Sequence, residues 1–200
     1  NELAKQRGVN VLPYRIHFIG SAIGPIATSA GPSLYATKAI DLASDGIDTL
    51  ICAGGVGSRA MSNDASAVNA VANLAINARR VVSVCTGAFV LAASGILNGK
   101  RAVSHWAHCD NLARRFPEVI VDPDPIFVRD DNVYTSAGIT AGMDLTLALI
   151  EEDLGRSFAT EVAKEMVMFL KRPGTQSQFS EHLRVQMAPD GNLKDVQLWI

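Results

Sequence analysis

Cysteine is scarce in this chain and follows no spacing motif. Its three cysteines are Cys52, Cys85 and Cys109, and no two of them stand in the CxxC spacing. An odd, widely spaced set argues against a disulfide framework and against a zinc knuckle, and it suits a reducing cytoplasm. We therefore expect a cytoplasmic protein without structural disulfides.

Long apolar runs and an excess of one charge are also missing. No apolar run approaches the ~18 residues of a transmembrane helix, and no signal peptide with a basic start and an apolar core is visible. Lysine and arginine number 18 against 20 aspartates and glutamates, which gives a net charge of −2. This balance offers no basic surface to a membrane or to nucleic acid, so we expect neither a membrane partner nor tight DNA binding by these residues.

The chain also lacks the usual patterns for a metal ion or a nucleotide. No histidine stands with cysteines or carboxylates at a spacing suited to a metal. The glycine-rich GGVGSR at 54–59 has neither the GxGxxG pattern nor the terminal GK[ST] of phosphate-binding loops. We therefore expect no metal and no cofactor.

What is present is an alternation of short apolar segments with longer helical patterns, in a chain that is 48% apolar and long enough for one well-filled domain. Strands are expected at 14–19, 48–55, 80–84 and 100–105, with a hairpin over 125–138 that turns at 130–132. Helices are expected at 64–78, with Asp64 in the first turn, from 86 onward, at 107–116, and at 141–155, with Gly155 as the stop. A last helix is expected at 158–170, where one apolar stripe is formed by Phe158, Val162, Met166 and Phe169. Strands alternating with helices predict an α/β domain with a mostly parallel sheet flanked by helices.

The last 29 residues differ in character from the rest. The segment 172–200, RPGTQSQFSEHLRVQMAPDGNLKDVQLWI, is polar, is broken by proline and glycine, and ends on an apolar cluster. We interpret 1–171 as one domain and 172–200 as a linker with the first turns of a further helix.

The stretch RRVVSVCTGAFVLAASG at 79–95 places Cys85 between a buried strand and a helix. Sites in open α/β sheets lie at the carboxyl ends of strands, and Gly54 and Gly55 end the preceding strand. A helix N-terminus favours the reactive thiolate form of a cysteine. The pattern by itself leaves two interpretations open, a site residue at a nucleophile elbow or a buried small apolar side chain.

Several motifs, in order, resemble one superfamily. SVCTGAFVLAASGILNGKRAVSHW, DTLICAGG, FVRDDNVYTSAGITAGMDLTLALIEEDLG and RPGTQSQFSEHL are similar to segments of the ThiJ/PfpI superfamily, and more narrowly to the sensor domain of GlxA-type regulators of the AraC family. The resemblance covers about residues 11–200. It implies the class I glutamine-amidotransferase-like fold, a flavodoxin-like three-layer sandwich, and a pocket at the elbow.

The resemblance also implies residues for that pocket. The backbone N–H groups of Gly55 and Thr86 would form an arrangement like an oxyanion hole, and His105 would line the same pocket. We therefore expect Gly54, Gly55, Cys85, Thr86 and His105 to bind a ligand, with Cys85 and His105 the candidates for any catalysis.

Two departures from the superfamily argue against catalysis. Protease-like members have a histidine directly after the cysteine, where this chain has Thr86. The first strand of the superfamily, which ends in an acidic residue, has no counterpart here, and 1–10 is similar to the end of the helix that follows it. We expect that strand, and the acidic partner of Cys85, to lie upstream of this sequence.

The function expected from the resemblance is binding, not turnover. A small-molecule effector would bias a homodimer and thereby act on DNA-binding helix-turn-helix units, which this chain lacks. The alternative is a Cys85-dependent hydratase or hydrolase similar to isonitrile hydratase. A thiol-stress module is a third, because an exposed thiolate forms sulfenic acid.

Overall fold

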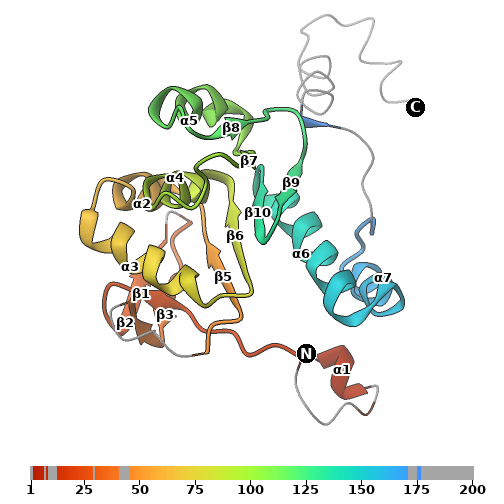
Figure 1. Ribbon diagram of the computed structural model, residues 1–200. Helices are drawn as coiled ribbons and strands as arrows, with labels where there is room; N and C mark the ends of the chain where they lie inside the picture. Colours follow the sequence, from red (N-terminus) through yellow and green to blue (C-terminus); the bar gives the residue numbers. More distant parts are fainter. Residues whose placement is uncertain are drawn as a thin grey trace, which may run out of the picture.

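Four strands form the central sheet of the computed structural model, in the order β5-β6-β10-β9 (Figure 1). Strands β5 (Thr49–Cys52), β6 (Arg80–Val84) and β10 (Val133–Ser136) are parallel, and β9 (Phe127–Asp130) joins β10 as an antiparallel hairpin. The structure describes residues 2–6, 8, 13–28, 30–40, 46–170 and 175–176. The strands expected at 48–55 and 80–84 and the hairpin over 125–138 are confirmed.

Helices cover both faces of this sheet, as Figure 1 shows. Helices α2 (Val56–Met61), α3 (Ala65–Ile76) and α4 (Ala88–Ala93) lie on one side, and α6 (Ile139–Leu154) and α7 (Arg156–Glu165) lie on the other. The mostly parallel sheet between two helical layers is the predicted flavodoxin-like three-layer sandwich.

Alternation along β6 divides the core between the two layers. Val81 joins the larger apolar cluster, which includes Phe89 and Leu91 of α4. Val82, the next residue, joins the smaller cluster with Leu145 and Leu149 of α6. Because successive side chains of a strand point to opposite faces, a continuously apolar strand such as β6 is buried on both sides.

The ends of two helices follow their expected signals. The carboxylate of Asp64 caps α3 by accepting hydrogen bonds from the N–H groups of Ser66 and Ala67 at 2.9 and 3.2 Å. Helix α6 ends at Gly155, whose φ of 82° is a conformation that glycine adopts without strain.

Short elements complete the described part of the chain. They are α1 (Glu2–Gln6), β1 (Ile19–Gly20), β2 (Gly24–Ala27), β3 (Ser33–Ala36), β4 (Lys38–Ala39), the 3-10 helices η2 (Cys85–Gly87) and η3 (Trp106–His108), β7 (Arg101–Ala102), α5 (Cys109–Arg115) and β8 (Ile120–Val121). The β2–β3 hairpin and helix α2 were not expected from the sequence.

Three expected elements need correction. The strand at 14–19 is wrong over most of its length, because only Ile19 and Gly20 pair, with β4, and the side chains of 15–18 are exposed. The strand at 100–105 is limited to Arg101 and Ala102. The helix at 158–170 begins at Arg156 and ends at Glu165, so Phe169, which is 74% exposed, does not continue its apolar stripe.

An ion-pair network ties the sheet to α6 at the end away from the elbow. Arg80, which is 3% exposed, pairs with Asp153 of α6 and donates to the hydroxyl of Thr49 on β5. Asp153 also accepts from Tyr14 and Arg79.

Strand β5 lies at the edge of the described sheet. It pairs with β6 on one side, and no other described strand pairs with it on the other side. The side chain of Ile51 on this strand is 54% exposed.

Candidate functional site

Cys85 occupies the corner between β6 and the helix that follows it. Its φ is 56°, in the left-handed region that residues other than glycine rarely adopt. Strain of this kind costs about 1–3 kcal/mol and persists only where the surrounding structure holds it. The strained turn expected at this cysteine is confirmed, and its side chain is half-buried.

Two glycines let the end of β5 press against this corner. A Cβ added to Gly87 would lie 2.1 Å from the carbonyl oxygen of Cys52, and one added to Gly54 would lie 2.7 Å from the Cβ of Cys85. Neither distance leaves room for a side chain. The backbones of β5 and the corner therefore meet in direct contact, as a shared site at the carboxyl ends of the strands requires.

Thr86 closes the space between the two strand ends. Its Oγ1 accepts a hydrogen bond from the N–H of Gly55 at 2.9 Å and lies 2.9 Å from the hydroxyl of Ser58. The Ser58 hydroxyl also donates to the carbonyl of Gly55 at 2.8 Å. Thr86 is 3% exposed. One of the two N–H groups expected to form an oxyanion hole is thus engaged by the side chain of the neighbouring threonine.

Ser104 connects the corner to His105. Its hydroxyl donates to the carbonyl of Cys85 at 2.9 Å. His105 follows directly and begins η3, where its Nδ1 accepts from the N–H of Ala107 at 3.3 Å. Contact between the sulfur of Cys85 and the imidazole of His105 stays a prediction.

The His105 ring lies in a partly apolar, aromatic setting. A Cβ at Gly138 would lie 3.3 Å from its Cδ2, and the ring centres of Trp106 and His108 lie 5.4 and 5.9 Å away. Burial, and secondarily the nearby His108, lower the pKa of His105 below its ordinary value. The neutral imidazole is therefore favoured near neutral pH, and with Nδ1 accepting, its proton lies on Nε2.

The other two thiols are poorly suited to ionise. Burial raises the pKa of Cys52 to about 12. Burial also raises the pKa of Cys109, whose Sγ donates to the carbonyls of Ser104 and His105 at 3.5 Å. Among the residues that the structure describes, no group of three or more His, Cys, Asp or Glu side chains could hold a metal ion.

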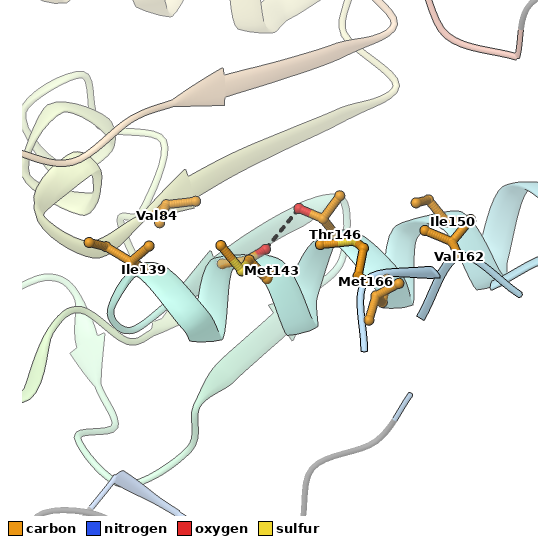
Figure 2. A pocket seen from close by; sticks show the side chains of 9 residues that line it. Val84, Ile139, Met143, Thr146, Ile150, Val162 and Met166 are labelled. Carbon is orange, nitrogen blue, oxygen red and sulfur yellow. Dashed lines mark hydrogen bonds between the residues drawn. The ribbon is translucent and has the colours of Figure 1, made fainter. Parts of the chain in front are cut away.

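An apolar groove of about 330 Å³ lies beside α6 and starts next to the corner (Figure 2). Its lining consists of Val84, Ile139, Gly142, Met143, Thr146, Leu147, Ile150, Val162 and Met166. Sequence reasoning identified Val162 and Met166 as part of an apolar stripe but missed the groove. The spacing of Ile139, Met143 and Ile150 along α6 is the signal that could have indicated it.

Ser58, Ser104 and Gln176 were also missed. Each acts through hydrogen bonds to residues distant in the sequence, so no local motif marks it. Gln176 belongs to the segment predicted as a linker. The structure describes only 175 and 176 of this segment, and the rest of 172–200 lies outside the described residues.

None of the described helices is long and apolar enough to cross a membrane.

The fold and the corner define an α/β domain with a cysteine at a nucleophile-elbow position. The sequence profile of the DJ-1/PfpI family matches residues 7–152. The chain therefore belongs to the DJ-1/PfpI family.

Characterised relatives include both an enzyme and regulators. Isonitrile hydratase from Pseudomonas putida is 36% identical over 141 residues, which are 70% of this chain and 60% of the relative. The HTH-type transcriptional regulator CdhR from Pseudomonas aeruginosa is 31% identical over 175 residues, 88% of this chain and 50% of the regulator. GlxA from Rhizobium meliloti is 33% identical over 156 residues, 75% of this chain and 46% of the relative. The chain thus spans about half the length of these two regulators.

Solved structures agree with this fold. A ThiJ/PfpI family protein from Pseudomonas syringae is 31% identical, with a TM-score of 0.70 over 80% of this chain and 64% of that one. An AraC family transcriptional regulator from Pseudomonas putida has a TM-score of 0.65 over 82% of this chain and 87% of that one. At 19% identity, the second likeness supports the fold alone.

Proposed function

We propose that this chain is the ligand-sensing domain of an AraC-type transcriptional regulator. A small-molecule effector binds at the site made by Gly54, Gly55, Cys85, Thr86 and His105, without being turned over. The domain, residues 1–171, works in the cytoplasm as a homodimer. DNA is contacted by a C-terminal helix-turn-helix domain that begins within 172–200, after the linker.

The relatives support the regulator class. CdhR, named as an HTH-type transcriptional regulator, matches 88% of this chain, and isonitrile hydratase matches 70%. Because both matches are of similar identity, the choice between a sensor and an enzyme depends on the chemistry of the site.

The hydrogen bond from Gly55 N–H to Thr86 Oγ1 is the main observation that favours ligand binding over catalytic turnover. An oxyanion hole stabilises a transition state when its donors are free and aimed at the developing charge. Here a ligand oxygen would have to displace the threonine hydroxyl from Gly55 first. Thr86 also stands where protease-like members of the superfamily have a histidine base, and a threonine hydroxyl is no general base near neutral pH.

The proposed mechanism is a shift between two arrangements of the dimer. A ligand shifts such an equilibrium only by as much as it binds one arrangement better than the other. A contact at Cys85 suits this role, because the left-handed corner lies where β5, β6 and η2 meet. A small displacement there acts on the backbones of all three elements.

A Cys85-dependent hydratase is the second candidate. It is favoured by the 36% identity to isonitrile hydratase and by a half-buried thiol at a strained corner. In that case Cys85 attacks a small nitrogen compound as a thiolate, and the covalent route is lost with the sulfur.

The variant Cys85→Ala separates the two candidates. For a sensor we expect a folded protein whose effector affinity changes by ~1–2 kcal/mol, the value of one or two contacts. For an enzyme, turnover falls by many powers of ten. The assay offers small nitriles, isonitriles and amides to the full-length protein, with Cys52→Ala as the matched control. Steady, Cys85-dependent turnover above ~1 s⁻¹ would overturn the sensor proposal.

A further inference from the structure

Gln176 is buried at the end of the sheet that carries the site. It is 7% exposed, although it follows a polar stretch of sequence. Its backbone N–H donates to the carbonyl of Asp124 at 2.8 Å. Its side-chain Nε2 faces the carbonyls of Pro123, Pro125 and Ser104 at 2.9, 3.1 and 3.3 Å. Figure 1 shows this short segment beside the connection between β8 and β9, far from the end of α7.

The socket around Gln176 is suited to an uncharged donor. Four carbonyl oxygens, from Ser104, Pro123, Asp124 and Pro125, point at the backbone N–H and side-chain NH₂ of Gln176. A carboxylate of the same shape would bring negative charge against these oxygens. The amide satisfies them without the desolvation cost of a buried ammonium or guanidinium group.

A continuous set of hydrogen bonds connects this socket to the elbow. The Ser104 carbonyl accepts from Gln176, while the Ser104 hydroxyl donates to the carbonyl of Cys85 at 2.9 Å. His105 is the next residue in the chain. One residue, Ser104, is therefore held by the C-terminal segment through its backbone and holds the strained corner through its side chain.

We propose that Gln176 is a positioning residue that couples the Cys85 site to the C-terminal segment of the chain. The part that concerns effector signalling rests on the proposed sensor function. A change at Cys85 displaces Ser104 and thereby weakens the hydrogen bonds that hold Gln176. Release of Gln176 in turn loosens Ser104 and the corner, because coupling between two sites is reciprocal.

Chemical modification of Cys85 provides a test that needs no effector. In the full-length protein, the rate of alkylation of Cys85 by iodoacetamide is measured by mass spectrometry for the parent, Gln176→Ala and Gln176→Glu. We expect both variants to react about fivefold faster or more, the lower range of typical coupling. Gln6→Ala, which truncates an exposed glutamine in α1, is the matched control and should react like the parent.

The reciprocal measurement separates coupling from a merely structural role. Hydrogen exchange of the Gln176 backbone amide is compared before and after Cys85 is alkylated in the parent protein. We expect exchange to become about fivefold faster or more. The same treatment of Cys85→Ala should leave it unchanged, which excludes effects of labelling elsewhere.

The outcomes decide the inference independently of the proposed function. Equal alkylation rates in folded Gln176 variants, or an unchanged Gln176 amide after alkylation, would overturn the coupling. If the variants do not fold, the exchange measurement on the parent decides alone. Turnover of nitriles or amides would instead remove the sensor function and leave the coupling in place.

Discussion

The N–H of Gly55 donates to the hydroxyl oxygen of Thr86 across 2.9 Å and so joins the end of β5 to the first turn after β6. The hydroxyl of Ser58 lies at the same distance from that oxygen. The backbone N–H of Gly55 and the hydroxyl of Ser58 in α2 therefore both depend on one threonine oxygen, and Thr86 is almost completely buried.

Thr86→Val should destabilise the protein by about 1–3 kcal/mol. Valine keeps the shape but removes the oxygen, so buried groups lose their partner. Urea unfolding measures the change. Thr160→Val, which removes an exposed hydroxyl in α7, is the control and should stay within about 0.5 kcal/mol of the parent. Equal unfolding midpoints for the two variants would contradict the role of the Thr86 hydroxyl.

Two glycine-to-alanine substitutions should change the free energy of unfolding in opposite directions. At Gly87 the new Cβ would lie 2.1 Å from the Cys52 carbonyl oxygen, so the backbone must move, at a cost of about 3 kcal/mol or more. At Gly57, in α2, no atom beyond the adjoining residues and the backbone of the helix itself lies within 4 Å of the new Cβ, and alanine should stabilise the helix by about 0.5 kcal/mol. Thermal or urea unfolding tests both, and a neutral Gly87→Ala would show that the contact relaxes freely.

Alkylation near pH 8 should be concentrated at Cys85. The pKa of Cys52 is raised to about 12 by burial and that of Cys109 is raised for the same reason, so few of their thiolates exist at this pH. Cys85 lies half-buried at the strained corner that follows β6. Brief labelling followed by peptide mass spectrometry gives the three rates. Faster reaction at Cys109 would count against the proposed site.

Acid should weaken the fold through Asp153 and Asp48. Burial raises the pKa of Asp153, but hydrogen bonds from Arg80, Tyr14 and Arg79 outweigh it and hold the pKa below its ordinary value. The Arg79 hydrogen bond lowers the pKa of Asp48 to about 2. A depressed carboxyl pKa contributes stability above the unfolded value of about 3.9 and loses it as pH falls through the folded value. The free energy of unfolding should therefore fall between about pH 5 and pH 2.

The variant Asp153→Asn tests this cause. It leaves the buried Arg80 without a charged partner and should cost about 3 kcal/mol near neutral pH. It should also reduce the dependence of stability on acid, as urea unfolding at several pH values would reveal. Asp110→Asn, at an exposed position on α5, should leave the pH dependence as it is in the parent. If the free energy of unfolding of Asp153→Asn falls with acid as steeply as that of the parent, groups other than Asp153 cause the loss of stability.

Local signals were sufficient for the central sheet. The apolar run at 80–84 became β6 with the same bounds, and the turn at 130–132 became the β9–β10 hairpin, with Asp131 at a φ of 52°. Strong signals of this kind do not depend on distant partners. Asp64 and Gly155 marked helix ends for the same reason, because capping is decided within one turn of the chain.

Elements without such signals could not be predicted. The β2–β3 hairpin contains proline and glycine, which weaken a strand pattern. The alternation at 14–19 was typical of a strand, but pairing is decided by the neighbour in space. The candidate site likewise has one part that local sequence predicts and another part that it does not. The corner at Cys85 is a local pattern, whereas the contacts of Ser58, Ser104 and Gln176 join residues 19 to 72 positions apart.

The outer side of β5 affects how this stretch of chain behaves when it is prepared by itself. A strand edge is a template onto which another chain can add, and apolar residues beside it favour such growth. With Ile51 more than half exposed, concentrated samples should self-associate along this edge. Ile51→Lys places a charge beside the edge and should suppress that association in light scattering. A dimer that persists in Ile51→Lys is then held by a different surface.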